Sequence, residues 1–296
     1  MRWAVAGYGD VVVRRVLPAL REAGEEVVGI WGRDQRRADE VATQHGIPVA
    51  TTELATLLAK VDAVYVATPV VTHVPLALAA VDAGRHVLVE KPLGGALRTE
   101  AEALAALAVE RGVTAGVAYY RRLNPALAQL RETLATQKVR RVSIDFRSPF
   151  EPAPDHPMRW RTEFSVSGGG VLADAGSHRL DLLCWLFGPP EAVVGLSADL
   201  FPGGAERTAV VRLHWPAGPT ASCRFTWGAG PSVDRMTITT AGGTIVLDPL
   251  DAGLAPNPHT PLVVDFARAA REGTTPACPL GDASLVDALI ARALRR

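Results

Sequence analysis

Two short motifs of the sequence carry residues that can move protons. Lys91 stands in the motif Glu90-Lys91-Pro92, directly after an apolar run, and Asp174 lies four residues before His178. A residue at the carboxyl end of a parallel strand faces the crevice where ligands bind, and a desolvated lysine can lose its proton, whereas arginine cannot. A carboxylate can orient an imidazole for acid–base work near neutral pH. The motifs therefore point to a proton-transfer site, with a surface lysine and a structural histidine as the plainer alternatives.

The helix predicted around His178 has one polar stripe. Asp174, His178 and Asp181 are spaced i, i+4 and i+7, so they share one face, and leucines and aromatic residues occupy most other directions. A helix that is apolar nearly all round is buried, so the stripe is not expected to be a solvated face. The three glycines at 168–170 would let a ligand approach the start of this helix. No further ligands are adjacent in the sequence, so we predict no metal site.

The sequence Gly7-Tyr8-Gly9 lies between the first predicted strand and the first predicted helix. Glycines at this position let the backbone turn approach a pyrophosphate, which sits on the helix N-terminus. Val12 stands where the fingerprint has its third glycine. In a strand–helix–strand context the motif favours dinucleotide binding over a plain tight turn.

The end of the second predicted strand bears on the choice of cofactor. An NAD site usually has an acid there, which holds the ribose hydroxyls, but this sequence has Gly32 followed by Arg33, with Arg36 and Arg37 close behind. A guanidinium beside a small residue suits a 2′-phosphate. Asp34 would be the ribose acid in a shifted register, or the N-cap of the next helix. The pattern favours NADP(H), with NAD(H) as the alternative.

The first half of the chain alternates short apolar strands with helices, which predicts a parallel, doubly wound α/β sheet. The expected strands are 3–7, 26–31, 61–68, 86–89 and 113–118, and the expected helices are 11–23, 36–45, 74–83 and 99–111.

The second half has consecutive strands with short turns, which predicts an antiparallel sheet with helices. Strands are expected at 139–147, 192–199, 207–215, 220–227, 236–240 and 244–247, helices at 127–137, 171–187, 262–271 and 281–295, and a loop at 150–164. We predict an NAD(P)-binding domain at 1–120 and an α+β substrate and oligomerisation domain at 121–296. The closing helices could pack back on the first domain.

Length, charge and cysteines narrow the class of protein. The 296 residues fit two domains, and 31 basic against 31 acidic residues argue against nucleic acid or an anionic membrane as the main partner. Cys184, Cys223 and Cys278 are far apart, which argues against a disulfide scaffold or a cysteine zinc site and fits a reducing compartment. There is no signal-peptide pattern, and the uncharged window 63–81 contains two prolines. We expect a cytoplasmic protein without membrane spans.

Taken together, these motifs make the chain similar to the glucose–fructose oxidoreductase / inositol dehydrogenase (Gfo/Idh/MocA) family over nearly its whole length. The segments that carry the resemblance are AVAGYGDVVVRRVLPAL, VYVATPVVTHVPLALAAVDAGRHVLVEKP, YRRLNPAL, RWRTEFSVSGGGVLADAGSHRLDLLCWLFG and PLGDASLVDALIARAL. The resemblance implies a Rossmann domain joined to an α+β domain with an open, mainly antiparallel sheet. It also implies hydride transfer between NAD(P) and a carbon of a sugar, cyclitol or related polyol.

The resemblance also assigns residues to the site. It implies that Lys91, Asp174 and His178 are the catalytic trio, and that they contact substrate together with Tyr120 and Arg122. The residues that it and the glycine motif assign to the cofactor are Gly7, Gly9, Asp10, Val11, Gly32, Arg33, Arg37, Thr68, Pro69, His73, Glu90, Lys91, Trp160 and Arg161.

The leading hypothesis is thus an NADP(H)-dependent oxidoreductase acting on a secondary alcohol or ketone of a sugar-like substrate. His178 or Lys91 takes the hydroxyl proton, Lys91 polarises the oxygen, and Asp174 orients His178. An NAD-dependent glycosidase of the same family and a non-catalytic sensor are the two alternatives. The strands between 192 and 247 suggest a sheet face for pairing of subunits, so we expect a homo-oligomer, a dimer or tetramer.

Overall fold

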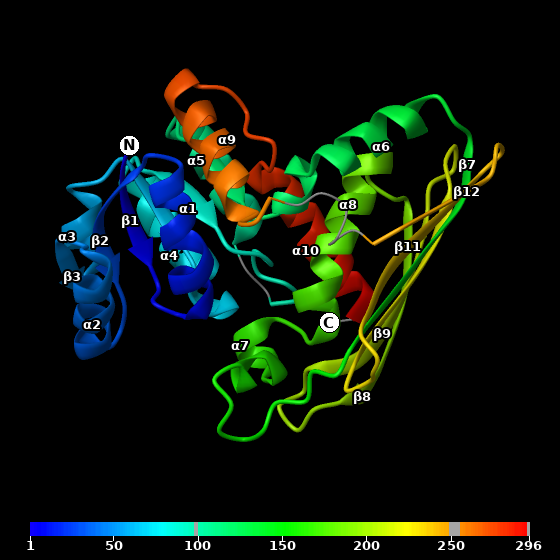
Figure 1. Cartoon of the computed structure of the whole chain (residues 1–296), viewed down its shortest axis with the longest axis horizontal. Coiled ribbons are helices and arrows are strands. Elements are labelled where there is room, and N and C mark those ends of the chain that lie inside the picture. Colours follow the sequence, from blue (N-terminus) through cyan, green and yellow to red (C-terminus); the bar gives the residue numbers. More distant parts are fainter. Residues whose placement is uncertain (98–99, 249–254, 295–296) are drawn as a thin grey trace. The chain divides into compact units, whose positions relative to one another are not determined.

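The computed structural model describes residues 1–97, 100–248 and 255–294 (Figure 1). The chain forms two compact units. The first comprises Met1–Leu93, Thr99–Tyr120 and Ala255–Gly281, and the second comprises Gly94–Arg98, Arg121–Leu254 and Asp282–Arg296.

The first unit is built on a parallel sheet of six strands. Its order is β3-β2-β1-β4-β5-β6, and every pairing is parallel. Apolar runs that are buried on both faces explain why alternation is absent from the central strands. The strands are β1 (Arg2–Ala6), β2 (Glu26–Trp31), β3 (Val49–Thr51), β4 (Ala63–Val66), β5 (His86–Val89) and β6 (Ala115–Val117). The predicted doubly wound sheet is confirmed.

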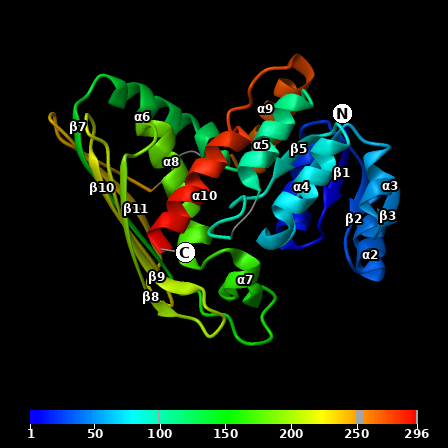
Figure 2. The same cartoon turned by 180° about the vertical axis from the view of Figure 1, so that it is seen from behind.

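Helices cover both faces of this sheet (Figures 1 and 2). Helix α1 packs with α9 and α4 packs with α5, since right-handed crossovers on either side of β1 place helices on opposite faces. The helical elements between the strands are a π-helical turn (Val12–Val16), α1 (Leu17–Glu22), α2 (Gln35–His45), α3 (Leu54–Leu58), a 3₁₀ turn (Val70–Thr72), α4 (His73–Asp82) and α5 (Ala101–Glu110).

The segment 255–281 returns to the first unit through helix α9 (His259–Glu272). The ring of Phe266 lies 5.7 Å from that of Trp3, and both side chains are buried. Arg271 pairs with Glu25, which also accepts a hydrogen bond from the Trp3 indole at 3.1 Å. The α9 helix is therefore part of the core around β1.

The second unit has a mixed sheet of six strands in the order β12-β11-β7-β10-β9-β8. All its pairings are antiparallel except β7 with β10. The predicted open, mainly antiparallel sheet is confirmed, and its one parallel pair arises because β10 returns beside β7 after the β8–β9 hairpin. The strands are β7 (Val139–Ser148), β8 (Ala192–Leu200), β9 (Glu206–His214), β10 (Thr220–Trp227), β11 (Val233–Thr240) and β12 (Thr244–Leu247).

One face of this second sheet carries helices α6, α8 and α10 (Figure 1). Helix α10 lies directly on β8, because a Cβ on Gly195 would be 2.1 Å from the carbonyl oxygen of Ala293. The opposite face has no helix over it in the described part of the chain. The helical elements of this unit are a 3₁₀ turn (Tyr120–Leu123), α6 (Pro125–Ala135), a 3₁₀ turn (Arg159–Thr162), α7 (Phe164–Ser167), a π-helical turn (Leu172–Gly176), α8 (Ser177–Phe187) and α10 (Leu280–Leu294).

Differences from the sequence predictions concern short elements. Strand β3 and helix α3 were not predicted, since a three-residue strand and a five-residue helix carry too few periods to be recognised. The predicted loop 150–164 contains a 3₁₀ turn and the start of α7. The predicted helices 99–111 and 281–295 each have one terminal residue outside the described part of the chain.

Candidate functional site

The carboxyl ends of four adjacent strands gather the motifs of the first unit. Ala6 of β1 is paired with both Trp31 of β2 and Val66 of β4, and Val66 is paired with Val89 of β5. The segments that follow these strands begin at the same edge of the sheet, which is where open α/β sheets bind ligands. They contain Gly7-Tyr8-Gly9, Gly32-Arg33, Thr68-Pro69 and Glu90-Lys91.

The glycine turn after β1 fits a dinucleotide pyrophosphate. Gly7 has φ +119°, and a Cβ there would lie 2.4 Å from the carbonyl oxygen of Ala67. Position 9, in contrast, has room for a side chain, because a Cβ on Gly9 would have no atom within 4 Å. The helix begins at Asp10 and Val11, so its first amides face the open space beside Gly9. Only the first glycine is required by the fold itself.

Tyr8 occupies the space beside Gly32. A Cβ on Gly32 would lie 1.7 Å from Cε1 of Tyr8, and the Tyr8 hydroxyl accepts a hydrogen bond from the Asp34 amide at 3.1 Å. The Asp34 carboxylate caps helix α2 by accepting from the Arg37 amide at 3.1 Å. The guanidinium of Arg37 lies 5.1 Å from the Tyr8 ring centroid. Arg33 is exposed, so its guanidinium is open to a ligand anion.

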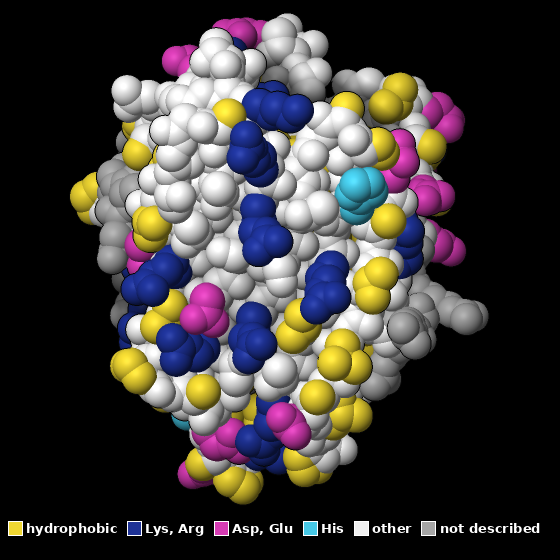
Figure 3. Space-filling view, turned by 90° about the vertical axis from the view of Figure 1, so that its right-hand side faces the viewer, with side chains coloured by type: hydrophobic (Ala, Val, Ile, Leu, Met, Phe, Trp, Pro, Cys, Tyr) yellow, Lys and Arg dark blue, Asp and Glu magenta, His cyan; other side chains and the backbone are white. Residues whose placement is uncertain are grey.

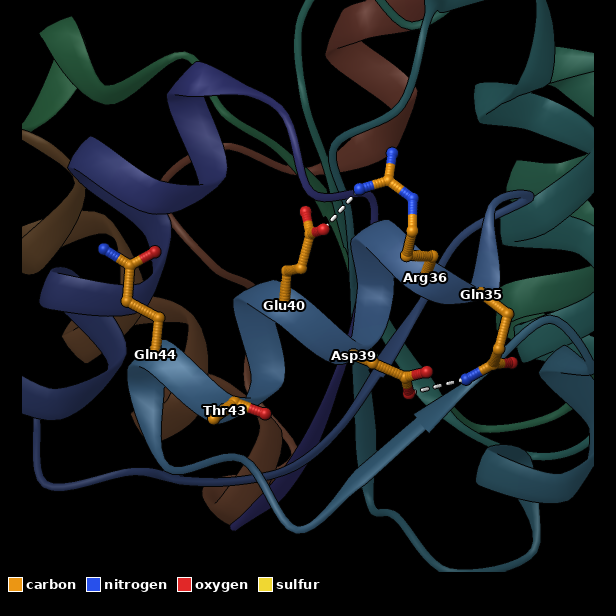
Figure 4. Close-up of a pocket in the computed structure, with 6 residues that line it drawn as sticks. All are labelled: Gln35, Arg36, Asp39, Glu40, Thr43 and Gln44. Carbon is orange, nitrogen blue, oxygen red and sulfur yellow. Dashed lines mark hydrogen bonds and ion pairs between the residues drawn. The ribbon is translucent and has the colours of Figure 1, made fainter.

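A shallow hollow along α2 does not add to this site. Its lining consists of polar side chains on one helix, four of which form two pairs (Figure 4). Arg36 forms an ion pair with Glu40, and the Gln35 amide donates to Asp39 at 2.8 Å. Arg36 is therefore less available to a phosphate than the sequence suggested. The lining residues are Gln35, Arg36, Asp39, Glu40, Thr43 and Gln44.

His73 braces two of the strand-end segments. Its ring is 1% exposed, and Nε2 and Nδ1 lie 2.8 Å and 2.9 Å from the carbonyl oxygens of Thr68 and Pro92. Burial lowers the pKa of His73, and the two carbonyls oppose that effect. A neutral imidazole donates from one nitrogen only, so His73 in that form donates to one of the two carbonyl oxygens, and its buried ring lies between the two backbones. Pro69 starts the 3₁₀ turn that leads into α4.

Glu90 is buried beside the Lys91 backbone. Its Oε1 accepts hydrogen bonds from the Tyr65 hydroxyl at 2.9 Å and from Nε2 of His259 at 3.0 Å, and its Oε2 lies 3.3 Å from the Lys91 amide. Burial favours a raised pKa for Glu90, but the bond from His259 and the Lys91 charge outweigh it, so the pKa is lowered. Sequence reasoning missed Tyr65 and His259. His259 is 169 residues from Glu90, and no motif links them.

In the second unit, Asp174 lies in the π-helical turn and is half-buried. Its Oδ2 is 3.2 Å from Nη1 of Arg161, and the guanidinium of Arg161 lies 5.6 Å from the ring centroid of Trp160. The structure thus brings together three of the predicted residues, Trp160, Arg161 and Asp174. A π-helical turn is a frequent feature of functional sites.

His178 is 5% exposed, one turn after Asp174 at the start of α8, and Asp181 follows at 1%. The Asp181 carboxylate accepts from Nε and Nη2 of Arg122 at 3.0 Å and 2.5 Å. Burial raises the pKa of Asp181 to about 6, and Arg122 opposes the rise. Arg122 also pairs with Asp282 at 2.6 Å. Its guanidinium is committed to carboxylates within the unit, so its predicted role toward substrate gains no support from this geometry.

The glycines at 168–170 serve the fold, contrary to the sequence interpretation. The Glu206 carboxylate accepts from the amides of Gly170 and Leu172 at 2.8 Å and 2.9 Å, and therefore caps the helix start that a ligand was expected to occupy. A Cβ on Gly170 would lie 1.9 Å from the Glu206 carbonyl oxygen, and one on Gly168 would lie 2.4 Å from that of Gly94. The absent side chains permit close backbone packing.

Comparison with known proteins follows this two-unit division. Residues 1–119 match the model "Oxidoreductase family, NAD-binding Rossmann fold", and residues 126–246 match the "GFO/IDH/MocA C-terminal domain". A 1,5-anhydro-D-fructose reductase of Ensifer adhaerens is 33% identical over 227 residues, which are 74% of this chain and 67% of the relative. The chain belongs to the Gfo/Idh/MocA family of oxidoreductases. A further relative is "D-xylose 1-dehydrogenase (NADP(+)) 2" of Haloferax volcanii. It is 31% identical over 223 residues, which are 75% of this chain and 68% of the relative.

Solved structures share the fold of this chain. GenD2 from gentamicin A biosynthesis, in complex with NAD, has a TM-score of 0.84 and 26% identity, and the match covers 100% of this chain and 93% of GenD2. The WlbA dehydrogenase of Bordetella pertussis, in complex with NADH and UDP-GlcNAcA, has a TM-score of 0.88 at 24% identity, with 100% and 95% covered. The predicted family, fold class and oxidoreductase class are confirmed.

The described residues contain neither a metal-binding cluster nor a membrane-spanning helix. No group of three or more His, Cys, Asp or Glu side chains is placed to hold a metal ion. No described helix has both the length and the apolar composition needed to cross a bilayer.

Proposed function

We propose that this chain transfers a hydride between NADP(H) and a secondary alcohol or ketone carbon of a sugar, cyclitol or related polyol. The observation that carries the proposal is the gathering of the glycine turn and Lys91 at one edge of a parallel sheet. The named relatives act on 1,5-anhydro-D-fructose and D-xylose, which supports a sugar-like substrate.

The preference for NADP(H) is supported by positions 32 and 34, the two places where an acid could bind the ribose hydroxyls. Neither position offers a free carboxylate to the ribose. Position 32 has no room for a side chain while Tyr8 stays in place, and the Asp34 carboxylate caps α2. Exposed Arg33, with Arg37 next to the Tyr8 ring, offers guanidinium groups to a 2′-phosphate. One relative carries NADP(+) in its name.

The catalytic roles follow from the chemistry of the side chains. The bound nicotinamide supplies or accepts the hydride. Lys91 polarises the substrate oxygen, and His178 or Lys91 moves the hydroxyl proton. Asp174 orients His178, and its ion pair with Arg161 favours the charged carboxylate. The pyrophosphate is held by the turn and helix start at Gly7, Gly9, Asp10 and Val11. Other contacts to the cofactor come from Thr68, Pro69 and Trp160, and a contact to the substrate comes from Tyr120.

A turnover panel tests this function. Purified enzyme is mixed with sugars, cyclitols and their ketones, with NADP(H) and NAD(H) in parallel, and absorbance of the reduced cofactor is followed. Net oxidation or reduction supports the proposal. Cleavage of a glycoside without net cofactor change would show the glycosidase alternative instead. Tight binding of cofactor and sugar without turnover of any substrate would show a sensor.

The outward face of the second sheet supports the proposed homo-oligomer. Basic side chains gather along the middle of this face (Figure 3), and apolar side chains are exposed at its edge strands, Val194 at 60% and Leu196 at 68% on β8 and Val246 at 60% on β12. Val194 and Leu196 share one face of β8 and form an apolar contact area at that edge, whereas Val246 lies at the opposite edge of the sheet. The arginines are Arg141, Arg147, Arg212, Arg224 and Arg235, with Asp145 opposite Arg224 and Arg235 in the strand register.

The state of the cysteines supports a reducing compartment, for which we propose the cytoplasm. Burial raises the pKa of Cys184 and of Cys223 to about 12, and the Cys278 thiol donates to the carbonyl oxygen of Tyr119. Free thiols, two of them buried and that of Cys184 half-buried, fit the reducing environment in which disulfides are rare.

A further inference from the structure

The glutamate beside Lys91 depends on a histidine from the other end of the sequence. Within the first unit, Nε2 of His259 lies 3.0 Å from Oε1 of Glu90, and the two side chains are 5% and 10% exposed. The carboxylate belongs to the end of β5, and the imidazole is the first residue of α9. This contact therefore joins the returning segment 255–281 to the Glu-Lys-Pro motif.

The backbone of His259 is held in place by contacts that do not involve Glu90. Its amide donates to Oδ1 of Asn257 at 3.2 Å, and the Asn257 side-chain amide donates to the Arg15 carbonyl at 2.9 Å. The middle of α9 is held by the contact of Phe266 with Trp3 of β1, and its last turn is held by the ion pair of Arg271 with Glu25. A side chain held in this way loses little further freedom when it forms its hydrogen bond.

The imidazole also contacts a second candidate site residue. The rings of His259 and Tyr120 have centroids 5.0 Å apart at 42°. Tyr120 follows the end of β6, the strand that neighbours β5. One histidine thus touches side chains that follow or end two adjacent strands at the ligand-binding edge.

Removing His259 would leave Glu90 with an unfavourable environment. A buried carboxylate is costly unless hydrogen bonds or a charge offset its lost hydration. Tyr65 would remain as a donor to this carboxylate, but one hydrogen bond offsets less of the lost hydration than two do. The carboxylate would then become protonated or turn away, and the Lys91 amide that contacts its Oε2 would shift with it.

We propose that His259 is a positioning residue for Lys91: it fixes the Glu90 carboxylate and the Tyr120 ring, and so fixes the chain that presents the lysine. The inference rests on the proposed function in one respect, the catalytic role of Lys91. Reaction geometry is sensitive to small displacements, since a shift of about 1 Å can reduce the rate by on the order of a hundredfold.

The test compares His259→Leu, which cannot donate, with His259→Gln, whose side-chain amide can donate to Glu90. We expect His259→Leu to lower kcat by about ten- to hundredfold, with KM and the Kd of NADPH within about twofold of wild type. His259→Gln should recover most of kcat. The matched control is His86→Leu at the opposite end of β5, where Nδ1 accepts from the Thr114 amide at 2.9 Å. It should leave kcat unchanged.

An infrared measurement separates this inference from the proposed function. His259→Leu should show an additional carboxylic-acid band at neutral pH, beyond the one that the buried Asp287 gives in every variant, and this additional band should be absent from wild type and from Glu90→Gln/His259→Leu. Appearance of that band in a chain without dehydrogenase activity would keep the Glu90–His259 coupling and refute the proposed function. Normal kcat in His259→Leu, or a kcat loss that His259→Gln fails to recover, would overturn the positioning role.

Discussion

A side chain at position 32 and the ring of Tyr8 would occupy the same space, since a Cβ on Gly32 would lie 1.7 Å from Cε1 of Tyr8. The sequence showed that Gly32 stands where an NAD site usually has an acid, but it did not show that Tyr8 fills the space beside Gly32. The two positions are 24 residues apart, and the clash arises only when β1 and β2 pair. The choice of cofactor therefore depends on both residues together.

This relationship predicts how the preference can be changed. Gly32→Asp alone should lower the melting temperature and weaken binding of both cofactors, because the new side chain displaces Tyr8. Tyr8→Gly/Gly32→Asp has room for the acid and should favour NADH. Arg33→Ala should raise the Kd of NADPH by about ten- to hundredfold and leave the Kd of NADH unchanged. Calorimetric titration of each variant with both cofactors provides the measurement. Tight NADH binding by Gly32→Asp alone, at an unchanged melting temperature, would contradict the argument.

His178→Ala tests the polar stripe of α8. Loss of a general acid–base should lower kcat by roughly 10²–10⁴-fold, whereas the Kd of NADPH stays close to wild type, because the glycine turn is untouched. Single-turnover kinetics with both cofactors give the two quantities. Near-normal turnover would reduce His178 to a structural residue.

Lys91→Arg separates charge from proton transfer. Arginine keeps the positive charge but does not release a proton at accessible pH. We expect Lys91→Arg to lose nearly as much kcat as Lys91→Met, measured under saturating substrate and cofactor. If arginine retains most of the rate, Lys91 acts only as a fixed charge and the proton-transfer role is wrong.

Regular periodicity made most of the fold predictable, and long-range polar contacts limited the prediction of the site. Strands β10 and β12 were predicted to the residue because alternation and turns define them. The polar stripe was found, yet Arg122 and Glu206 could not be paired with Asp181 and Gly170 from spacing alone. The glycines at 168–170 illustrate the reason: a residue suited to a ligand is equally suited to a close backbone contact.

Asp287 makes stability depend on pH. It is buried on α10, at 7% exposure, and its Oδ2 accepts from the Gly94 amide at 2.6 Å. Burial raises the pKa of this carboxyl to about 8, against bonds from the Gly94 and Gly95 amides, whereas an unfolded aspartate has a pKa of about 3.9. Between about pH 4 and pH 8 the folded state binds more protons, so the free energy of unfolding falls as pH rises.

Asp287→Asn should remove this fall. Its amide oxygen still accepts from Gly94, but it does not ionise. Urea midpoints measured between about pH 4 and pH 9 should decline for wild type and stay flatter for the variant. Asp155→Asn, at an exposed position, is the control and should follow wild type. Parallel curves for wild type and Asp287→Asn would show that Asp287 ionises alike in both states.

The exposed sheet face predicts how subunits associate. Leu196→Asp places a charge at an exposed apolar position of β8, and it should shift the mass measured by light scattering toward the monomer, since a buried unpaired charge is costly. Val109→Asp is the matched control, because Val109 is 82% exposed on α5, in the other unit. Facing copies bring their arginines together, so association should strengthen as salt screens them. A wild type that is monomeric at every concentration, or dissociation by Val109→Asp alone, would contradict the assignment of this face.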